Sequence, residues 1–173
     1  MSTETQQAPD REEAIAKLRD LIKGIDIAML TTIDTTDGTL RSRPMSTNGD
    51  VEFDGDIWFF TYASAHKVDE IEANPQVNAA FARPDKQDYV SLSGKAELVK
   101  DRTKIEELWK PQLKAWFPKG TDDPDIALLK VSVEKAEYWD APASVVAHAI
   151  GLVKATLTGK QPQLGEDVKL DLR

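Results

Sequence analysis

The sequence predicts an α+β fold in which six or seven short strands form an antiparallel barrel or sheet, with a helix near each end of the chain and small helices between strands. Short apolar runs recur along the chain and are separated by Asp-Gly, Asn-Gly and Pro-containing turns. Helical spacing of apolar residues is confined to segments near the two ends and to short connections. A chain of 173 residues fits one domain.

That domain is expected over residues 10–158, between a disordered N-terminus at 1–9 and a polar C-terminal tail at 159–173. In its first half, Asp10 is the predicted N-cap of a helix and Gly24 ends that helix. The Asp37-Gly38 pair marks the turn of a β-hairpin. The expected elements are a helix over 11–23, strands over 25–33, 40–46 and 57–61, and a short helix over about 64–74. The strand at 57–61, IWFFT, is apolar on both faces, which favours a central place in the sheet.

The second half predicts further strands and two helices. Gly94 interrupts a long strand, so a bulge or kink is expected there. The helix that follows is capped by Asp101 and broken at Pro111. The expected elements are strands over 76–82, 89–100, 127–133 and 136–139, a helix beginning after residue 101, and a C-terminal helix over about 144–158.

Composition excludes several classes of function. The net charge of −8 argues against general nucleic-acid binding, which needs a basic surface. No apolar run approaches the length that spans a bilayer, and the first residues lack the pattern of a signal peptide. With no Cys, the chain has no disulfide and no thiolate metal site. We therefore expect a cytoplasmic protein that binds neither membranes nor nucleic acid.

The stretch LRSRPMS, residues 40–46, places two arginines on one face of a predicted strand. Neighbouring guanidinium groups repel each other unless an anion lies between them. One interpretation is a phosphate ligand, because guanidinium groups grip phosphate oxygens bidentately. The other is that Arg41 and Arg43 bind Asp54, Asp56 or Glu70 and hold the loops. Spacing alone does not decide between them.

A second cationic group lies in the stretch FFTYASAHK, residues 59–67. A strand ends at Thr61 and a helix follows, so Ser64, His66 and Lys67 are placed at a helix N-terminus, where anions bind readily. If the strand with the arginines pairs beside 57–61, the two cationic groups converge. Most aromatic residues are explained by core packing, but Trp116 and Phe117 lie in a segment rich in Pro, Gly and Asp. Such a segment suits a lid over a flat ring or a protein interface.

These residues resemble the FMN-binding split β-barrel family related to pyridoxamine 5′-phosphate oxidase, and most closely its short general-stress-protein branch. The matching stretches occur in family order over about residues 10–158. They are DGTLRSRPM, IWFFTYASAHKVDEI, NPQVNAAFA, YVSLSGKAEL, WFPKGTDDPDIALLKV and AEYWDAP. The resemblance implies a mostly antiparallel split β-barrel of six to seven strands with N-terminal, connecting and C-terminal helices, and FMN as cofactor.

The resemblance also implies roles for particular residues. A flavin would be lined by Arg41, Ser42, Arg43, Pro44 and Met45, contacted by Phe60 and Thr61, and held at its phosphate by Ser64, His66 and Lys67 with help from an arginine. The family is similar in being homodimeric with two flavins between subunits, so Trp116 and Trp139 are expected to close over the flavin of the partner chain.

The same resemblance implies an FMN-dependent oxidoreductase or reductase with a stress-related role, reduced by NADH or NADPH. No catalytic side chain is predicted, because the chemistry would belong to the cofactor. The arginine and histidine that grip the substrate phosphate in pyridoxamine phosphate oxidases have no counterpart in the tail, so vitamin B6 oxidation is not expected. The alternatives are a non-catalytic protein that stores or senses FMN, and a split barrel that uses a deazaflavin or haem.

Overall fold

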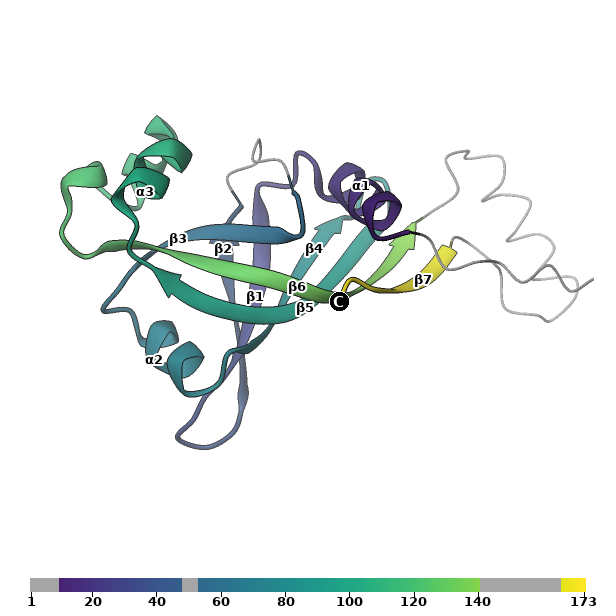
Figure 1. Ribbon diagram of the computed structural model, residues 1–173, viewed down its shortest axis with the longest axis horizontal. Helices are drawn as coiled ribbons and strands as arrows, with labels where there is room; N and C mark the ends of the chain where they lie inside the picture. The colour runs from purple at the N-terminus through teal and green to yellow at the C-terminus, as the bar shows by residue number, and fades with distance from the viewer. Residues whose placement is uncertain (1–9, 48–52, 141–165) are drawn as a thin grey trace, which may run out of the picture.

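A computed structural model of the chain describes residues 10–47, 53–140 and 166–173 (Figure 1). Within these ranges, seven strands form one antiparallel sheet in the order β2-β1-β4-β5-β6-β3, with β7 also paired to β6. The strands are β1 Ile27–Ile33, β2 Leu40–Ser46, β3 Asp56–Tyr62, β4 Gln76–Arg83, β5 Asp88–Val99, β6 Ile126–Asp140 and β7 Glu166–Asp171. The predicted α+β class and antiparallel pairing are confirmed.

Three α-helices and two short 3₁₀ helices accompany this sheet in the described part of the chain. They are α1 Arg11–Ile22, α2 His66–Ala73, α3 Arg102–Leu108, η1 Pro111–Ala115 and η2 Gly120–Asp122. Figure 1 shows α3 and the 3₁₀ helices gathered at one end of the sheet, away from α1. The predicted C-terminal helix at 144–158 lies outside the described residues. None of the helices within the described ranges has the length and apolar character that crossing a membrane requires.

Helix α1 forms because its apolar side chains recur at helical spacing and reach the sheet. Ala14, Ile15, Leu18 and Leu21 are buried in the main core. After the helix, the chain turns at Gly24, where φ is +76°, a conformation that glycine adopts without strain. The predicted cap at the other end is only partly correct, since Asp10 precedes the helix but its side chain makes no capping hydrogen bond.

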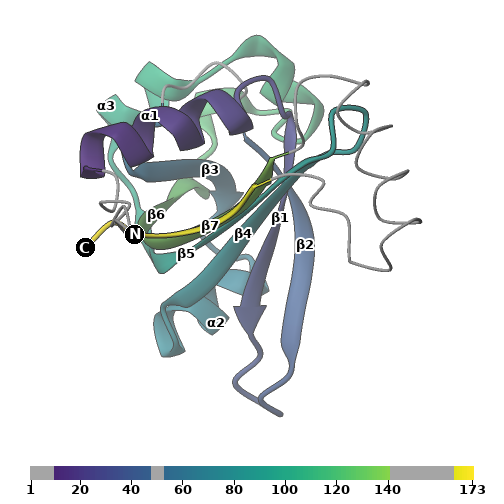
Figure 2. The same ribbon diagram turned by 90° about the vertical axis from the view of Figure 1, so that its right-hand side faces the viewer.

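Strands β1 and β2 form the predicted hairpin, with Thr32 opposite Arg41 and Leu30 opposite Arg43. Figure 2 shows this hairpin extending beyond the rest of the sheet. The loop between the strands is held by Asp34, whose Oδ1 accepts hydrogen bonds from the amide and hydroxyl of Thr36 at 2.9 and 2.6 Å. This short loop fixes the register and thereby the face on which the two arginines lie.

Strand β3 is not central, which corrects the prediction. Among the described residues it pairs only with β6, and β2 pairs only with β1, so β2 and β3 are the two edges of an unclosed sheet that approach each other without a ladder. Alternate residues of β3 nevertheless enter two different cores. Ile57 and Phe59 belong to the main core, whereas Phe60 packs with α3 and η1. Both faces of β3 are apolar because one is buried in the main core and the other by α3 and η1.

Strand β6 is one continuous strand of 15 residues, where two separate runs were predicted. The bulge at Gly94 is confirmed, because the β5–β6 register shifts between Ser93 and Gly94. A Cβ atom at Gly94 would lie 2.1 Å from the carbonyl oxygen of Ser132, so the crossing backbone leaves no room for a side chain. The bend introduced here lets β6 pair with β3 along one half and with β7 along the other.

The last residues are part of the folded domain, which corrects the prediction of a polar tail. Residues 166–171 form β7 along β6, and Leu170 and Leu172 are buried in the main core. Arg11 of α1 donates a hydrogen bond from Nε to the carbonyl oxygen of Leu172 at 3.1 Å. The alternation of polar and apolar residues in EDVKLDL has the period of a half-buried strand. The strand was not predicted because the segment is polar on average.

Candidate functional site

A cavity of about 390 Å³ opens where the ends of β2 and β3 meet the first turn of α2 and the segment that includes η1. This volume is within the usual range for small-molecule sites. Most of the wall is apolar or aromatic, and the polar groups are few. The cavity is lined by Ile27, Pro44, Met45, Ser46, Phe60, Thr61, Tyr62, Lys67, Leu113, Trp116 and Phe117.

The aromatic wall is built by a second, smaller core. Pro111 begins the 3₁₀ helix that carries Leu113, and the chain then returns toward β3. Phe117 packs on Phe60 and Tyr62, with ring centroids 6.1 and 5.0 Å apart. These contacts hold the segment over the cavity and leave the side chain of Trp116 58% exposed at its rim. Trp116 therefore lies at the rim of the cavity of its own chain, whereas Phe117 is largely a packing residue.

Lys67 is the one cationic side chain of the cavity wall. It is half-buried, and it makes no ion pair or hydrogen bond with the described part of the chain. Burial and the neighbouring charge of Arg43 lower the pKa of Lys67, while Glu70 opposes this shift. An anion beside the amino group would favour its charged form. The cavity therefore combines largely apolar walls with one cationic group that makes no ion pair within the described residues.

The two arginines are bound to carboxylates of the protein itself. Arg41 Nε lies 2.6 Å from Asp34 Oδ2, and Arg43 lies 3.0 Å from Glu70 Oε2. Arg43 also donates to the hydroxyl of Thr32 at 2.6 Å. Of the acceptors considered from the sequence, only Glu70 is used, because Asp56 pairs with Lys130 instead.

Neither Arg41, Ser42 nor Arg43 lines the cavity, in contrast to Pro44 and Met45 from the same strand. Side chains alternate along β2, and Ser42 faces outward, where its hydroxyl lies 2.7 Å from that of Thr31. The expectation that this whole stretch lines one ligand is met by its second half only. The arginines form a charged layer beside the cavity, in contact with α2 through Glu70.

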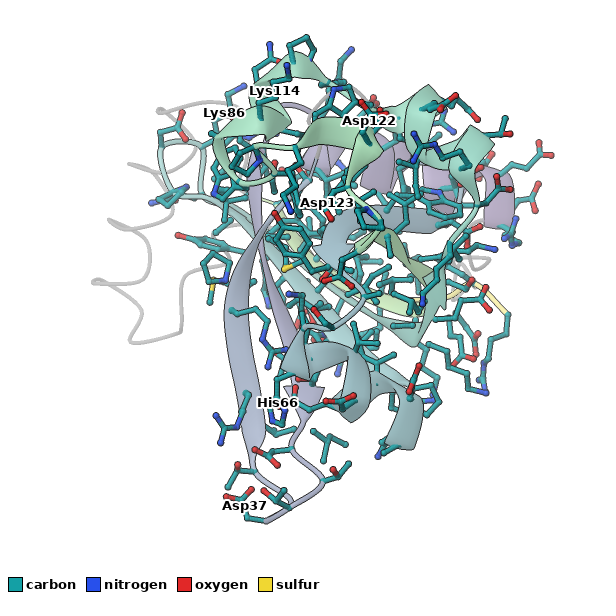
Figure 3. All side chains as sticks on the ribbon, turned by 90° about the vertical axis from the view of Figure 1, so that its left-hand side faces the viewer. Asp37, His66, Lys86, Lys114, Asp122 and Asp123 are labelled. Carbon is teal, nitrogen blue, oxygen red and sulfur yellow. The ribbon has the colours of Figure 1, made fainter. Side chains whose placement is uncertain are left out.

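The other two residues of the predicted phosphate site differ from Lys67. His66 is exposed at the start of α2 beside the hairpin, and its Nε2 lies 3.5 Å from Glu70 Oε1 (Figure 3). Ser64 binds Asp125, since its amide donates to Oδ1 at 3.1 Å and its hydroxyl donates to Oδ2. Ser64 therefore anchors the turn before α2 to the loop before β6. Neither residue lines the cavity.

Trp139 lies at the opposite end of β6 from the cavity. Phe60 pairs with Leu128, and eleven residues, or roughly 35 Å of extended strand, separate Leu128 from Trp139. Trp139 is 41% exposed beside Tyr89. Within one chain, Trp139 does not reach the cavity.

A cluster of Asp34, His66 and Glu70 presents three possible metal-ligand atoms within 4.8 Å of one another. Its charge environment disfavours a cation, because Arg41 and Arg43 already pair with the two carboxylates. Hydrogen bonds from Thr36, together with Arg41, hold the pKa of Asp34 below its usual value against the effect of desolvation. We interpret the cluster as an ion-pair network. Sequence reasoning missed Asp34 because the acidic residue lies in a turn and meets Arg41 only through the hairpin register.

Fold and cavity together define a split-barrel protein with a largely apolar cavity beside an ion-pair network. A family model described as pyridoxamine 5′-phosphate oxidase like matches residues 13–163. The chain therefore belongs to the pyridoxamine 5′-phosphate oxidase-like family, and the expected split barrel is confirmed.

Similar proteins include several general stress proteins. The chain is 27% identical to protein bli-3 of Neurospora crassa over 157 residues, which cover 86% of this chain and 75% of that protein. Identity to general stress protein 26 of Bacillus subtilis is 25% over 136 residues, covering 76% and 92% of the two chains. The membership in a family with general stress proteins, predicted from the sequence, is confirmed.

Solved structures agree with this grouping. A general stress protein 26 from Jannaschia sp. superposes with a TM-score of 0.72 at 25% identity, over 92% of this chain and 99% of that chain. The general stress FMN/FAD binding protein of Xanthomonas citri superposes with a TM-score of 0.66 at 28% identity, over 78% of this chain and 93% of that chain. Among these relatives, the Xanthomonas protein is the one named for its ligand.

Proposed function

We propose that this protein binds FMN, with the isoalloxazine ring in the cavity between Met45, Phe60 and Trp116 and the phosphate beside Lys67. The observation that carries the proposal is the half-buried Lys67 at the wall of an otherwise largely apolar cavity. A flat aromatic ring matches the apolar walls, and a phosphate would give Lys67 the ion pair that it does not make within the described residues. The FMN/FAD binding relative from Xanthomonas citri supports this choice of ligand.

In this proposal the roles predicted from the sequence divide into two groups. Pro44, Met45, Phe60, Thr61 and Trp116 contact the flavin from the cavity wall. The remaining residues act around the phosphate: Lys67 binds it directly, His66 approaches it from the first turn of α2, and the arginines contribute positive potential from the adjacent network. Ser64 contributes by fixing that turn through Asp125.

We also propose that the protein is a homodimer with the flavin between the subunits. Six large hydrophobic side chains of the described residues are exposed, and five of them lie on the outer face of the sheet: Ile27, Met29, Leu40, Tyr89 and Trp139. Cross-strand pairing places small residues between them, since Met29 is opposite Pro44 and Ala80. A flat apolar face of this kind suits a self-complementary interface. It would also bring a partner's tryptophans toward the flavin.

The proposed activity is that of a flavin-dependent oxidoreductase reduced by NADH or NADPH, with a role in stress and a cytoplasmic location. The protein would position and shield the ring while the cofactor supplies the redox chemistry. The side chains of the cavity wall that can donate a hydrogen bond are the amino group of Lys67 and the hydroxyl groups of Ser46, Thr61 and Tyr62. A non-catalytic protein that stores or senses FMN would need the same cavity and differs only in turnover.

The absorption spectrum of the purified protein tests the cofactor first. Maxima of oxidised flavin support the proposal, whereas a Soret band or a deazaflavin spectrum would replace FMN by one of the alternative ligands. Anaerobic addition of NADH or NADPH then separates the two functions. Bleaching of bound flavin followed by repeated turnover with an added acceptor identifies an oxidoreductase, and a spectrum that stays oxidised with both donors favours the storage or sensing protein.

A further inference from the structure

The carboxylate of Glu70 lies on α2 and is 1% exposed. Its Oε2 accepts hydrogen bonds from the hydroxyl of Thr32 and from Arg43, the latter at 3.0 Å. Its Oε1 has no hydrogen-bond partner within the described ranges. Burying a carboxylate oxygen without a hydrogen-bond partner costs free energy, so the groups around Oε1 indicate the role of this carboxylate.

A histidine and an arginine lie near Oε1, and they come from two different elements. His66 Nε2 lies 3.5 Å away from the first turn of α2, and Arg41 Nε lies 4.0 Å away from β2. Glu70 also favours the charged form of Lys67, which lines the cavity. One carboxylate therefore interacts with four side chains that the proposed function places around the phosphate.

The balance of charge gives Glu70 its effect. The cluster contains the cationic groups of Arg41, Arg43 and Lys67 and the carboxylates of Asp34 and Glu70, with Asp37 near Arg41 and Asp69 3.8 Å from His66 at its edge. Removing the charge of Glu70 makes the net charge of this cluster more positive by one. An anion bound by Lys67 is thus attracted by the cluster and at the same time repelled by a carboxylate placed inside it.

We infer that Glu70 is a positioning residue that determines how strongly the site prefers a phosphorylated flavin over an unphosphorylated one. The inference rests on the proposed function. Glu70 holds Arg43 in place through Oε2, and its negative charge limits the affinity for the phosphate, so that the flavin can exchange. Removing the charge of Glu70 while keeping the shape of its side chain should therefore strengthen FMN binding. Removing a residue that binds the phosphate directly, such as Lys67, should weaken it.

Glu70→Gln tests this, because the amide oxygen can still accept the hydrogen bonds of Thr32 and Arg43. Dissociation constants for FMN and riboflavin are measured by flavin fluorescence on protein stripped of cofactor. We expect FMN to bind roughly three- to tenfold more tightly at low salt, with riboflavin changed less than twofold. Glu72→Gln, an exposed change on the same helix, should leave both constants as in the wild type.

The result that overturns the inference is a ratio of FMN to riboflavin affinity that Glu70→Gln leaves unchanged or lowers. A wild-type protein that binds both flavins equally would instead overturn the phosphate site itself. If the single variant does not fold, Glu70→Gln with Arg43→Gln removes both partners of the ion pair and preserves the charge balance. The wild-type ratio is then expected within twofold, and its loss would likewise overturn the inference.

Discussion

Replacing Lys67 by methionine should separate ligand binding from folding. Methionine keeps most of the apolar stem that lines the cavity and removes the ammonium group. A charge-assisted hydrogen bond to phosphate contributes about 1.5–3 kcal/mol, so the FMN dissociation constant should rise roughly 12- to 150-fold. Riboflavin lacks the phosphate and should lose little affinity. Calorimetric or fluorescence titration of both flavins gives the two constants.

Lys67→Met should weaken FMN binding without reducing the stability of the ligand-free protein at neutral pH. Because burial and Arg43 lower the pKa of Lys67 from 10.5, the folded state resists protonation of this group more than the unfolded state does. Wild-type stability should therefore rise as the pH increases from the lowered pKa toward 10.5, and Lys67→Met should remove that rise. Below the lowered pKa the variant should be at least as stable as the wild type, measured by urea unfolding.

Lys114→Met provides a matched control, because Lys114 is exposed on η1 next to the cavity-lining Leu113. This change should leave both flavin affinities near the wild-type values. Equal losses of FMN and riboflavin affinity in Lys67→Met would refute the placement of the phosphate at Lys67. A large loss of stability at neutral pH would contradict the unfavourable burial of the Lys67 charge.

Three further changes probe the fold, the lid and the interface. Gly94→Ala should destabilise the protein by about 1–3 kcal/mol in urea unfolding, because the new methyl group meets the carbonyl oxygen of Ser132; an unchanged midpoint would contradict the close crossing. Trp116→Ala should weaken FMN and riboflavin alike and change bound-flavin fluorescence, with little effect on unfolding since Trp116 is exposed; selective loss of FMN would contradict its place at the ring. Met29→Lys should convert a dimer to a monomer in light scattering, while Thr35→Lys on the hairpin turn should not; a dimer that persists in Met29→Lys would exclude the outer face as the interface.

The local elements of the fold were predictable because their signals are local. The helical spacing in α1, the Asp-Gly turn of the β1–β2 hairpin and the bulge at Gly94 depend on residues close in sequence. The place of β3 was not predictable in the same way. One of its two apolar faces, that of Phe60, is buried by α3 and η1, segments about fifty residues further along the chain, and no pattern within 57–61 distinguishes that burial from a central position in a sheet.

The candidate site shows the same division. Its apolar wall was found because Phe60, Thr61 and Trp116 resemble residues of a known family. The partners of the arginines were predicted only in part. Glu70, which reaches Arg43 from a helix, was one of three acceptors considered, whereas Asp34, which reaches Arg41 through the hairpin, was not. Ion pairs between residues distant in sequence depend on the tertiary structure. The spacing of the two arginines therefore does not predict which carboxylates they bind.

The sequence by itself determined the family, the order of the elements and the presence of cationic groups before and after β3, because these depend on residue type and spacing. Only the tertiary structure decided which cation lines the cavity. The burial and ion pairing of these cations depend on how β2, β3 and α2 pack together. This packing places Lys67 in the wall of the apolar cavity, whereas Arg41 and Arg43 form ion pairs with Asp34 and Glu70.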